Sequence, residues 1–100
     1  MPKKYNDEFI DVLFDAITTF ETRDECALLF KDLCTIPELK AMSQRFIVAK
    51  MLKEEMVYSE IVRLTGASTA TISRVNRSLN YENKGGYDLV LERLEKKNNG

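Results

Sequence analysis

The sequence contains no histidine and few of the residues that build metal or disulfide sites. Its two cysteines, Cys26 and Cys34, are eight positions apart, and no Cys-x-x-Cys pair occurs. This pattern argues against a zinc site and a disulfide scaffold, so we expect no metal and two reduced, buried thiols. Because the chain also lacks a glycine-rich phosphate loop and a nucleophile elbow, we do not expect an enzyme.

Long apolar runs are missing as well. No segment approaches the roughly 20 apolar residues that a membrane-spanning helix needs. The N-terminal lysines, Lys3 and Lys4, are not followed by the apolar stretch of a signal peptide. We therefore expect a cytoplasmic protein with no membrane partner, and the length of 100 residues predicts a single domain over residues 1–100.

Glycine is absent from residues 1–65, and no strand-like alternation of apolar and polar residues appears there. The sequence therefore predicts an all-α fold. Two segments, Thr22–Glu25 and Thr35–Glu38, have the form of a capping box, which starts a helix. The predicted helices run from about Asn6 to Phe20, from Arg23 to Leu33, and from the second capping box to about Glu54.

The first predicted helix is apolar over an unusually large part of its circumference. Its apolar residues are Phe9, Ile10, Val12, Leu13, Phe14, Ala16, Ile17 and Phe20. A second copy of the chain is a natural source of cover for such a helix. The same pattern equally fits an ordinary core helix of a single chain.

Charge is unevenly distributed along a chain whose net charge is only −1. Residues 1–39 contain four basic and nine acidic residues, whereas residues 40–79 contain seven basic and three acidic residues. Residues 80–100 contain four of each sign, which completes the totals of 15 basic and 16 acidic residues. A basic segment favours an anionic partner, and the candidate here is nucleic acid.

The most distinctive segment, residues 58–79, reads as two short helices joined at Gly66. Glycine tolerates the positive φ of a sharp turn after a helix, and Ser68 has a side chain suited to capping the next helix. Ile72, Val75 and Leu79, at spacings of three and four, predict a narrow buried stripe on that helix. The pattern is that of a helix-turn-helix, with an ordinary αα-hairpin as the alternative.

The outward side of the second short helix is small, hydroxylated and basic. Alanine and threonine methyl groups can contact a thymine methyl, hydroxyl groups can bond to base edges or phosphates, and arginine binds phosphate or guanine. We predict that this helix recognises double-stranded DNA sequence-specifically in the major groove. The candidate DNA-binding residues are Ser59, Ser68, Thr69, Ala70, Thr71, Ser73, Arg74 and Arg77.

One motif and three residue pairs resemble the Trp repressor family. They are Gly66-Ala67-Ser68-Thr69-Ala70-Thr71-Ile72-Ser73-Arg74, together with Glu55-Met56, Glu60-Ile61 and Ser78-Leu79. The resemblance covers about residues 34–80, is strongest over 55–79, and is closest to the Trp-repressor-like subgroup of the YerC/YecD type. It implies an intertwined all-α homodimer that regulates transcription as a repressor, with the second short helix of each subunit in successive major grooves.

The resemblance also implies a site for the corepressor L-tryptophan, between an arginine of the central helix and a threonine and an arginine of the recognition helix. Thr71 and Arg74 match the recognition-helix pair. Counting back from the helix-turn-helix without a gap places Gln44, not Arg45, at the central arginine's position. A shift of one residue turns a side chain by about 100° around a helix. Gln44, Arg45, Thr71 and Arg74 are therefore a candidate ligand site, but we expect no cofactor, because the shift argues against L-tryptophan; any small-molecule effector is unknown.

Asparagine and glycine after Leu79 predict a loop, and a last helix is expected from about Tyr87 to Lys97. Two alternative functions fit parts of the sequence. One is a small helical dimer that acts as a protein-interaction module, which Met42, Met51 and Met56 favour. The other is an architectural DNA-binding protein that works without a ligand.

Overall fold

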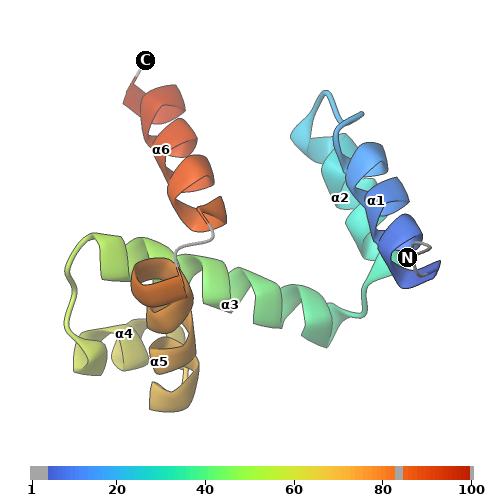
Figure 1. Ribbon diagram of the computed structural model, residues 1–100. Helices are drawn as coiled ribbons and strands as arrows, with labels where there is room; N and C mark the ends of the chain where they lie inside the picture. The colour runs from blue at the N-terminus through green and yellow to red at the C-terminus, as the bar shows by residue number, and fades with distance from the viewer. Residues whose placement is uncertain (1–4, 83–84, 100) are drawn as a thin grey trace. The chain divides into compact units, whose positions relative to one another are not determined.

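The structure is a computed structural model that describes residues 5–82 and 85–99. The helices are α1 (Tyr5–Ile17), α2 (Arg23–Leu33), α3 (Ile36–Lys53), α4 (Tyr58–Thr65), α5 (Thr69–Arg77) and α6 (Gly86–Asn99), with a short π-helical turn, η1 (Ser78–Glu82), after α5 (Figure 1). No β-strand occurs in the described ranges, which confirms the predicted all-α class. None of the helices in these ranges combines the length and hydropathy of a membrane span.

The chain divides into two compact units, Met1–Leu39 and Lys40–Gly100. The first unit contains α1, α2 and the first turn of α3. The second unit contains the rest of α3 together with α4, α5, η1 and α6. The single domain predicted for residues 1–100 stays a prediction.

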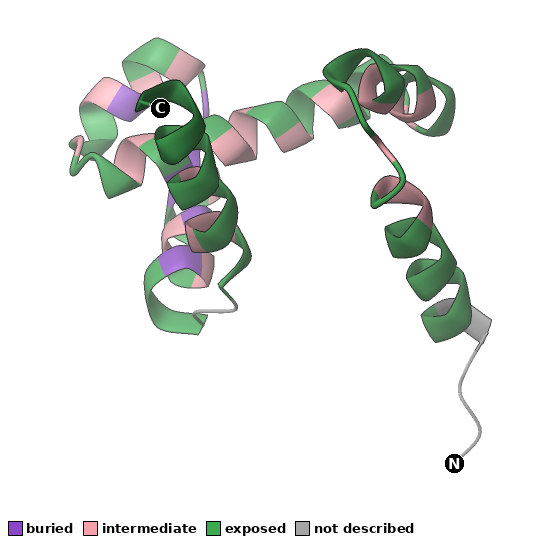
Figure 2. Ribbon diagram, turned by 90° about the horizontal axis from the view of Figure 1, so that it is seen from above, coloured by how far each residue is buried: buried purple, intermediate pink, exposed green. Residues whose placement is uncertain are grey.

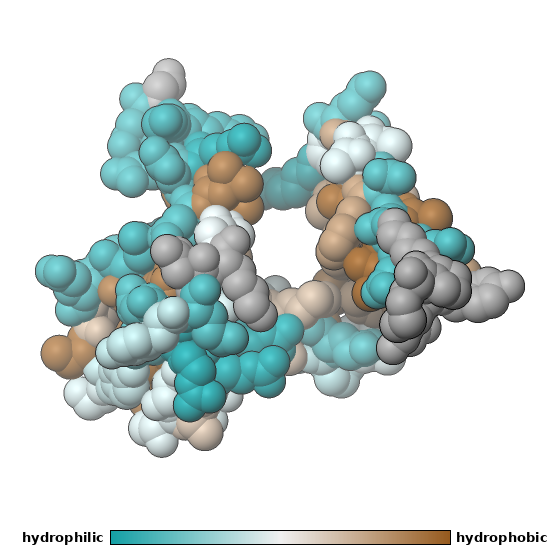
Figure 3. Space-filling model, in the orientation of Figure 1, coloured by the Kyte–Doolittle hydropathy of each residue, from teal (hydrophilic) through white to brown (hydrophobic). Residues whose placement is uncertain are grey.

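The first unit is a helix pair that buries none of its described side chains. Every side chain from Asp7 to Leu39 is exposed or half-buried, and Figure 2 draws these helices in green and pink. Phe9, Val12 and Phe14 of α1 are 62%, 66% and 58% exposed. Hydrophobic residues, drawn in brown, reach the surface of this unit in Figure 3. The apolar circumference predicted for the first helix is therefore present, and this unit does not cover it.

Hydrogen bonds at the predicted capping boxes start α2 and α3. The Thr22 hydroxyl accepts the Glu25 N–H at 3.1 Å, but the Glu25 carboxylate accepts the N–H of Glu21 at 2.9 Å instead of that of Thr22. The second box is complete, because the Thr35 N–H donates to the Glu38 carboxylate at 2.8 Å and the Glu38 N–H donates to the Thr35 hydroxyl at 3.2 Å. Hydrogen bonding to the Glu38 carboxyl, first from the Thr35 backbone N–H and then from the Thr35 side chain, lowers the pKa of that carboxyl.

The end of α3 turns the chain sharply toward α4. The Met56 N–H donates to the Met51 carbonyl at 3.1 Å, and the Glu55 N–H donates to the Leu52 carbonyl at 3.0 Å. These two bonds form a Schellman motif, and Glu55 takes the left-handed conformation that the motif requires, with φ of 62°. The long helix therefore ends at a defined residue, without a glycine.

The buried residues in the described part of the chain form a core in the second unit, drawn in purple in Figure 2. They come from α3, α4 and α5, from the turn that joins the last two and, in the case of Leu79, from η1. The cluster comprises Val48, Ala49, Ile61, Ala67, Ile72 and Val75, none of which is more than 2% exposed. This core confirms the predicted inner stripe of the second short helix. It also packs that helix against α3.

The chain stays helical where a loop was predicted after Leu79. Helical structure continues through η1 to Glu82, and the Asn80 amide donates to the Asn76 side-chain oxygen at 2.6 Å, one turn earlier. The loop prediction is therefore wrong for residues 80–82, and residues 83 and 84 lie outside the described ranges. The hydrogen bond between the Asn76 and Asn80 side chains, which are four residues apart, stabilises helical structure at a position where asparagine alone favours a turn.

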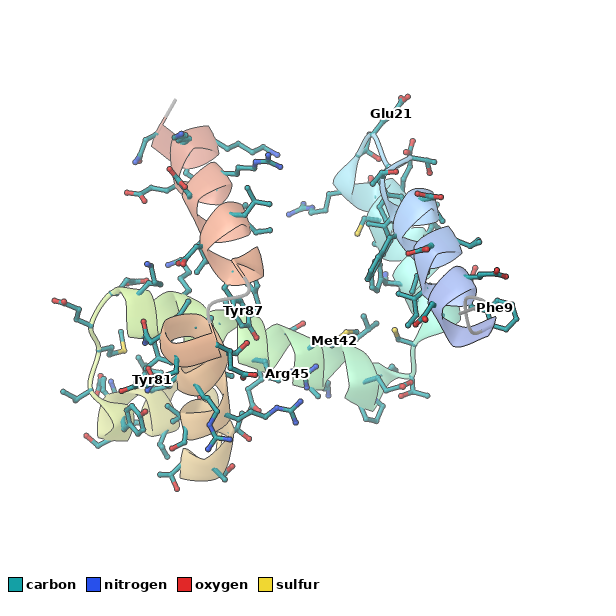
Figure 4. The ribbon with its side chains drawn as sticks, in the orientation of Figure 1. Phe9, Glu21, Met42, Arg45, Tyr81 and Tyr87 are labelled. Atoms are coloured by element: carbon teal, nitrogen blue, oxygen red, sulfur yellow. The ribbon has the colours of Figure 1, made fainter. Side chains whose placement is uncertain are left out.

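The start of α6 is attached to α3 by one ring contact and one ion pair. The Tyr87 ring packs against Phe46, with centroids 6.3 Å apart, and Figure 4 labels Tyr87 at this junction. Lys53 Nζ lies 2.9 Å from the Asp88 carboxylate. Farther along, α6 exposes an apolar side, formed by Leu89, Val90 and Leu94.

The two cysteines are free thiols, as predicted, but their burial was predicted wrongly. Cys26 and Cys34 are half-buried, because they lie in the unit that has no buried core of its own. Within residues 5–82 and 85–99, no group of three or more cysteine, aspartate or glutamate side chains could hold a metal ion.

Candidate nucleic-acid interface

Hydrogen bonds around Thr65 and Gly66 fix the turn between α4 and α5. Gly66 has φ of 72°, in the left-handed region, and its N–H donates to the Val62 carbonyl at 2.9 Å. The Thr65 hydroxyl donates to the Ile61 carbonyl at 2.7 Å and accepts the Ala67 N–H at 3.1 Å. The predicted glycine turn is confirmed, and Thr65 adds two bonds that the sequence pattern did not predict.

Ser68 caps α5 as predicted. Its hydroxyl oxygen accepts the Thr71 N–H at 3.1 Å and donates to the Thr71 hydroxyl oxygen at 3.0 Å. On the inner side of the helix, Ile72 and Val75 are 0% and 2% exposed. Because the cap and the inner stripe are both engaged by the protein, the opposite side of α5 is presented to solvent.

Most of the candidate DNA-binding residues lie on this outward side. Thr71 is half-buried, and the remaining seven candidates are exposed. Those at the cap and along α5 are Ser68, Thr69, Ala70, Ser73, Arg74 and Arg77, whereas Ser59 lies in the first turn of α4. One nine-residue helix and its cap therefore carry all of the candidates except Ser59.

The basic residues of the segment 40–79 differ in whether a carboxylate already neutralises them. Three of them are paired: Lys50 with Glu54 at 2.9 Å, Lys53 with Asp88 at 2.9 Å, and Arg63 with Glu60. The Arg63 hydrogen bond also lowers the pKa of Glu60. Within the described residues, the others in this segment, Lys40, Arg45, Arg74 and Arg77, form no ion pair. Within this segment, the positive charge free to meet a phosphate therefore lies on α5 and on the part of α3 between Lys40 and Arg45.

Two residues of the candidate ligand site are already bonded to the protein. Gln44 Nε2 donates to the Thr65 carbonyl at 3.2 Å, and the Thr71 hydroxyl oxygen accepts from Ser68. The other two, Arg45 and Arg74, are half-buried and exposed, respectively. Gln44, which the count from sequence predicts at the position of a central-helix arginine, therefore binds the helix-turn-helix itself. The sequence pattern missed this bond because 21 residues separate its two ends.

Comparison with known proteins gives a family match over most of the chain. A family model described as Trp repressor protein matches residues 8–95. The chain is also similar to the uncharacterized protein YerC of Bacillus subtilis (strain 168), with 48% identity over 86 residues. The similar region covers 86% of this chain and 82% of YerC.

Two solved structures resemble this one in fold and in sequence. A TrpR-like protein from Eubacterium eligens ATCC 27750 superposes with a TM-score of 0.83 and 55% identity, over 88% of this chain and 90% of that one. A candidate Trp repressor from Staphylococcus aureus superposes with a TM-score of 0.82 and 44% identity, over 93% and 96% of the two chains.

Proposed function

The chain belongs to the Trp repressor family, whose members are DNA-binding transcription regulators and not enzymes, and on this premise we propose that it is a sequence-specific repressor that binds DNA as a homodimer. The observation that carries the proposal is the outward face of α5. That face is small and hydroxylated, it holds two arginines without carboxylate partners among the described residues, and a buried core fixes it to α3. Because the ligand is DNA, we place the protein in the cytoplasm.

The dimensions and chemistry of α5 suit the major groove. A helix fits this groove, which is about 12 Å wide, when its outward side chains are short enough to let the backbone approach the bases. Thr69, Ala70 and Ser73 meet that condition, and their methyl and hydroxyl groups match thymine methyls and base-edge acceptors. Arg74 and Arg77 lie toward the end of the helix and supply charge for the backbone phosphates.

The first unit supports the homodimeric part of the proposal. A helix pair with no buried side chain lacks a core of its own, and small units of this kind are stabilised by association. The exposed aromatic and aliphatic side chains of α1 offer the apolar surface that a second copy needs. In an intertwined pair, the two α5 helices contact successive major grooves, about 34 Å apart.

We propose that DNA binding does not need tryptophan. The Gln44 amide nitrogen already donates to the Thr65 carbonyl, and an amide lacks the charge with which an arginine holds a carboxylate. Calorimetric titration of the protein with L-tryptophan to millimolar concentration is therefore expected to give no heat of binding. A saturable heat would show that the family's ligand site is retained despite Gln44.

Selection of binding sites from random DNA tests the function directly. The expected result is an enriched palindrome whose half-sites are one helical turn apart. Replacing Thr71 by valine, or Ala70 by serine, is expected to relax the preference at one base position, because each good base contact that the substitution removes is worth about 1–3 kcal/mol. Selection that returns no palindrome at any salt concentration would reject specific recognition and leave the interaction module or the architectural DNA-binding protein.

Arg77→Ala separates phosphate recognition from base recognition. We expect it to weaken binding to all DNA sequences and to reduce the slope of log affinity against log salt by about 0.9 for each phosphate that the arginine neutralises. Arg63→Ala is the matched control, because Glu60 already neutralises Arg63, and it should leave the slope unchanged. Fluorescence anisotropy between about 50 and 200 mM salt, where such slopes are steep, measures both variants. Equal slopes for the two variants would remove Arg77 from the interface.

A further inference from the structure

Gln44 links the long helix α3 to the turn of the helix-turn-helix. Its side-chain Nε2 donates to the main-chain carbonyl of Thr65, the last residue of α4, at 3.2 Å, and Gln44 itself is half-buried. A carbonyl at the end of a helix has no acceptor role within that helix and needs another donor. The side-chain hydrogen bonds of the caps and the turn join residues no more than four positions apart, whereas this one spans 21 residues.

The turn that Gln44 holds is internally fixed. The hydroxyl of Thr65 is bonded on both sides, to the Ile61 carbonyl at 2.7 Å and to the Ala67 N–H at 3.1 Å. The N–H of the next residue, Gly66, donates to the Val62 carbonyl at 2.9 Å. A single bond to the Thr65 carbonyl therefore fixes the whole turn relative to α3, and not one residue alone.

The core beneath α5 does not fix orientation in the same way. Its members, among them Val48, Ile61 and Ile72, are apolar, and apolar burial has no preferred direction. A hydrogen bond holds both distance and angle. With nine residues, α5 is about 13.5 Å long, so a rotation of about 10° at the turn moves its far end by about 2 Å. That displacement exceeds what a hydrogen bond to a base edge tolerates.

We propose that Gln44 is a positioning residue for DNA recognition, which holds α5 in the orientation for reading bases through its bond to the Thr65 carbonyl. The inference rests on the proposed DNA-binding function and adds to it the element that sets the recognition geometry without a ligand. Base contacts depend on orientation, whereas phosphate contacts tolerate small rotations. Loss of the Gln44 donor therefore lowers affinity for the selected sequence and leaves affinity for random DNA nearly unchanged.

The experiment compares Gln44→Met with Gln44→Lys. Methionine keeps the length and the helix preference of glutamine but has no donor, and lysine restores a donor of similar reach. The readout is the ratio of affinity for the selected palindrome to affinity for random DNA, at a temperature where thermal unfolding shows each variant folded. We expect Gln44→Met to lower this ratio about tenfold, which corresponds to roughly 1.4 kcal/mol. We expect Gln44→Lys to keep the ratio within about threefold of that of the unchanged protein.

A charge-matched control and a spectroscopic measurement complete the design. Ala41→Lys adds the same charge at an exposed position of α3 and is expected to raise both affinities together, which leaves the ratio unchanged. The carbonyl carbon resonance of Thr65 reports the bond itself and is expected to shift in Gln44→Met but not in Ala41→Lys.

Each outcome decides one question. A folded Gln44→Met protein with an unchanged ratio would overturn the positioning role while leaving DNA recognition intact. If Gln44→Met does not fold, a folded Gln44→Lys protein with a retained ratio supports the role, and one with a lowered ratio overturns it. Absence of a selected palindrome for the unchanged protein would reject the proposed function itself, before any variant is compared.

Discussion

Replacing Phe9 and Phe14 together by glutamate is expected to turn the protein into a monomer and to lower its affinity for a two-half-site DNA by more than about 100-fold, the range that bivalent binding supplies. The two rings are 62% and 58% exposed in one chain, and Figure 4 shows Phe9 pointing away from the helix pair. In the proposed dimer these rings are buried against the second copy. Unpaired carboxylates in that surface cost several kcal/mol each.

Sedimentation equilibrium measures the mass, with the unchanged protein expected at twice the 11.5 kDa of one chain. Lys31→Glu is the matched control, because it also changes the net charge by two units, at an exposed position of α2. The control is expected to stay dimeric. A Phe9→Glu/Phe14→Glu protein that still sediments at twice the chain mass would remove α1 from the dimer interface.

Replacing Ile72 by alanine is expected to lower the free energy of unfolding by about 2–5 kcal/mol, the range for truncating a buried aliphatic side chain. Ile72 is 0% exposed and packs in the core that joins α5 to α3 and α4. Since small domains have total stabilities of about 5–15 kcal/mol, this loss is a large fraction of the whole. Urea unfolding followed by circular dichroism measures it.

Two milder variants show whether burial is the cause. Ile72→Val removes one methylene and is expected to cost about 0.5–1.5 kcal/mol. Leu64→Ala truncates a side chain of α4 that is 48% exposed, and its expected cost is below about 1 kcal/mol. If Leu64→Ala costs as much as Ile72→Ala, the second short helix is not held by the apolar core around Ile72.

The helix-turn-helix was predictable because its signals are local. Gly66 provides the left-handed turn, Ser68 caps the next helix, and the spacing of Ile72 and Val75 gives the buried stripe. The Thr35–Glu38 capping box likewise fixes the start of α3 within four residues. Each of these features depends on neighbours in sequence, so the pattern of residues contains the information.

Features that depend on contacts distant in sequence were not predictable. The bond from Gln44 to Thr65 joins two helices, and nothing near either residue indicates it. Threonine before Gly66 gives no sequence signal of its own, yet the Thr65 hydroxyl closes the turn. The half-burial of Cys26 and Cys34 was also missed, because the apolar residues around them predict a core that the first unit does not have.

Because no side chain between Asp7 and Leu39 is buried, the stability of this segment is expected to depend on the concentration of the protein in the cell. In the proposed dimer, this segment gains its folding energy from association, so its folded fraction follows mass action. Each tenfold dilution removes about 1.4 kcal/mol from the association free energy. At low copy number the segment is then an open substrate for proteases, whereas at high copy number it is protected. The cellular lifetime of the protein would thus depend on its own abundance, and the onset of the proposed repression would be steeper than DNA binding alone would make it.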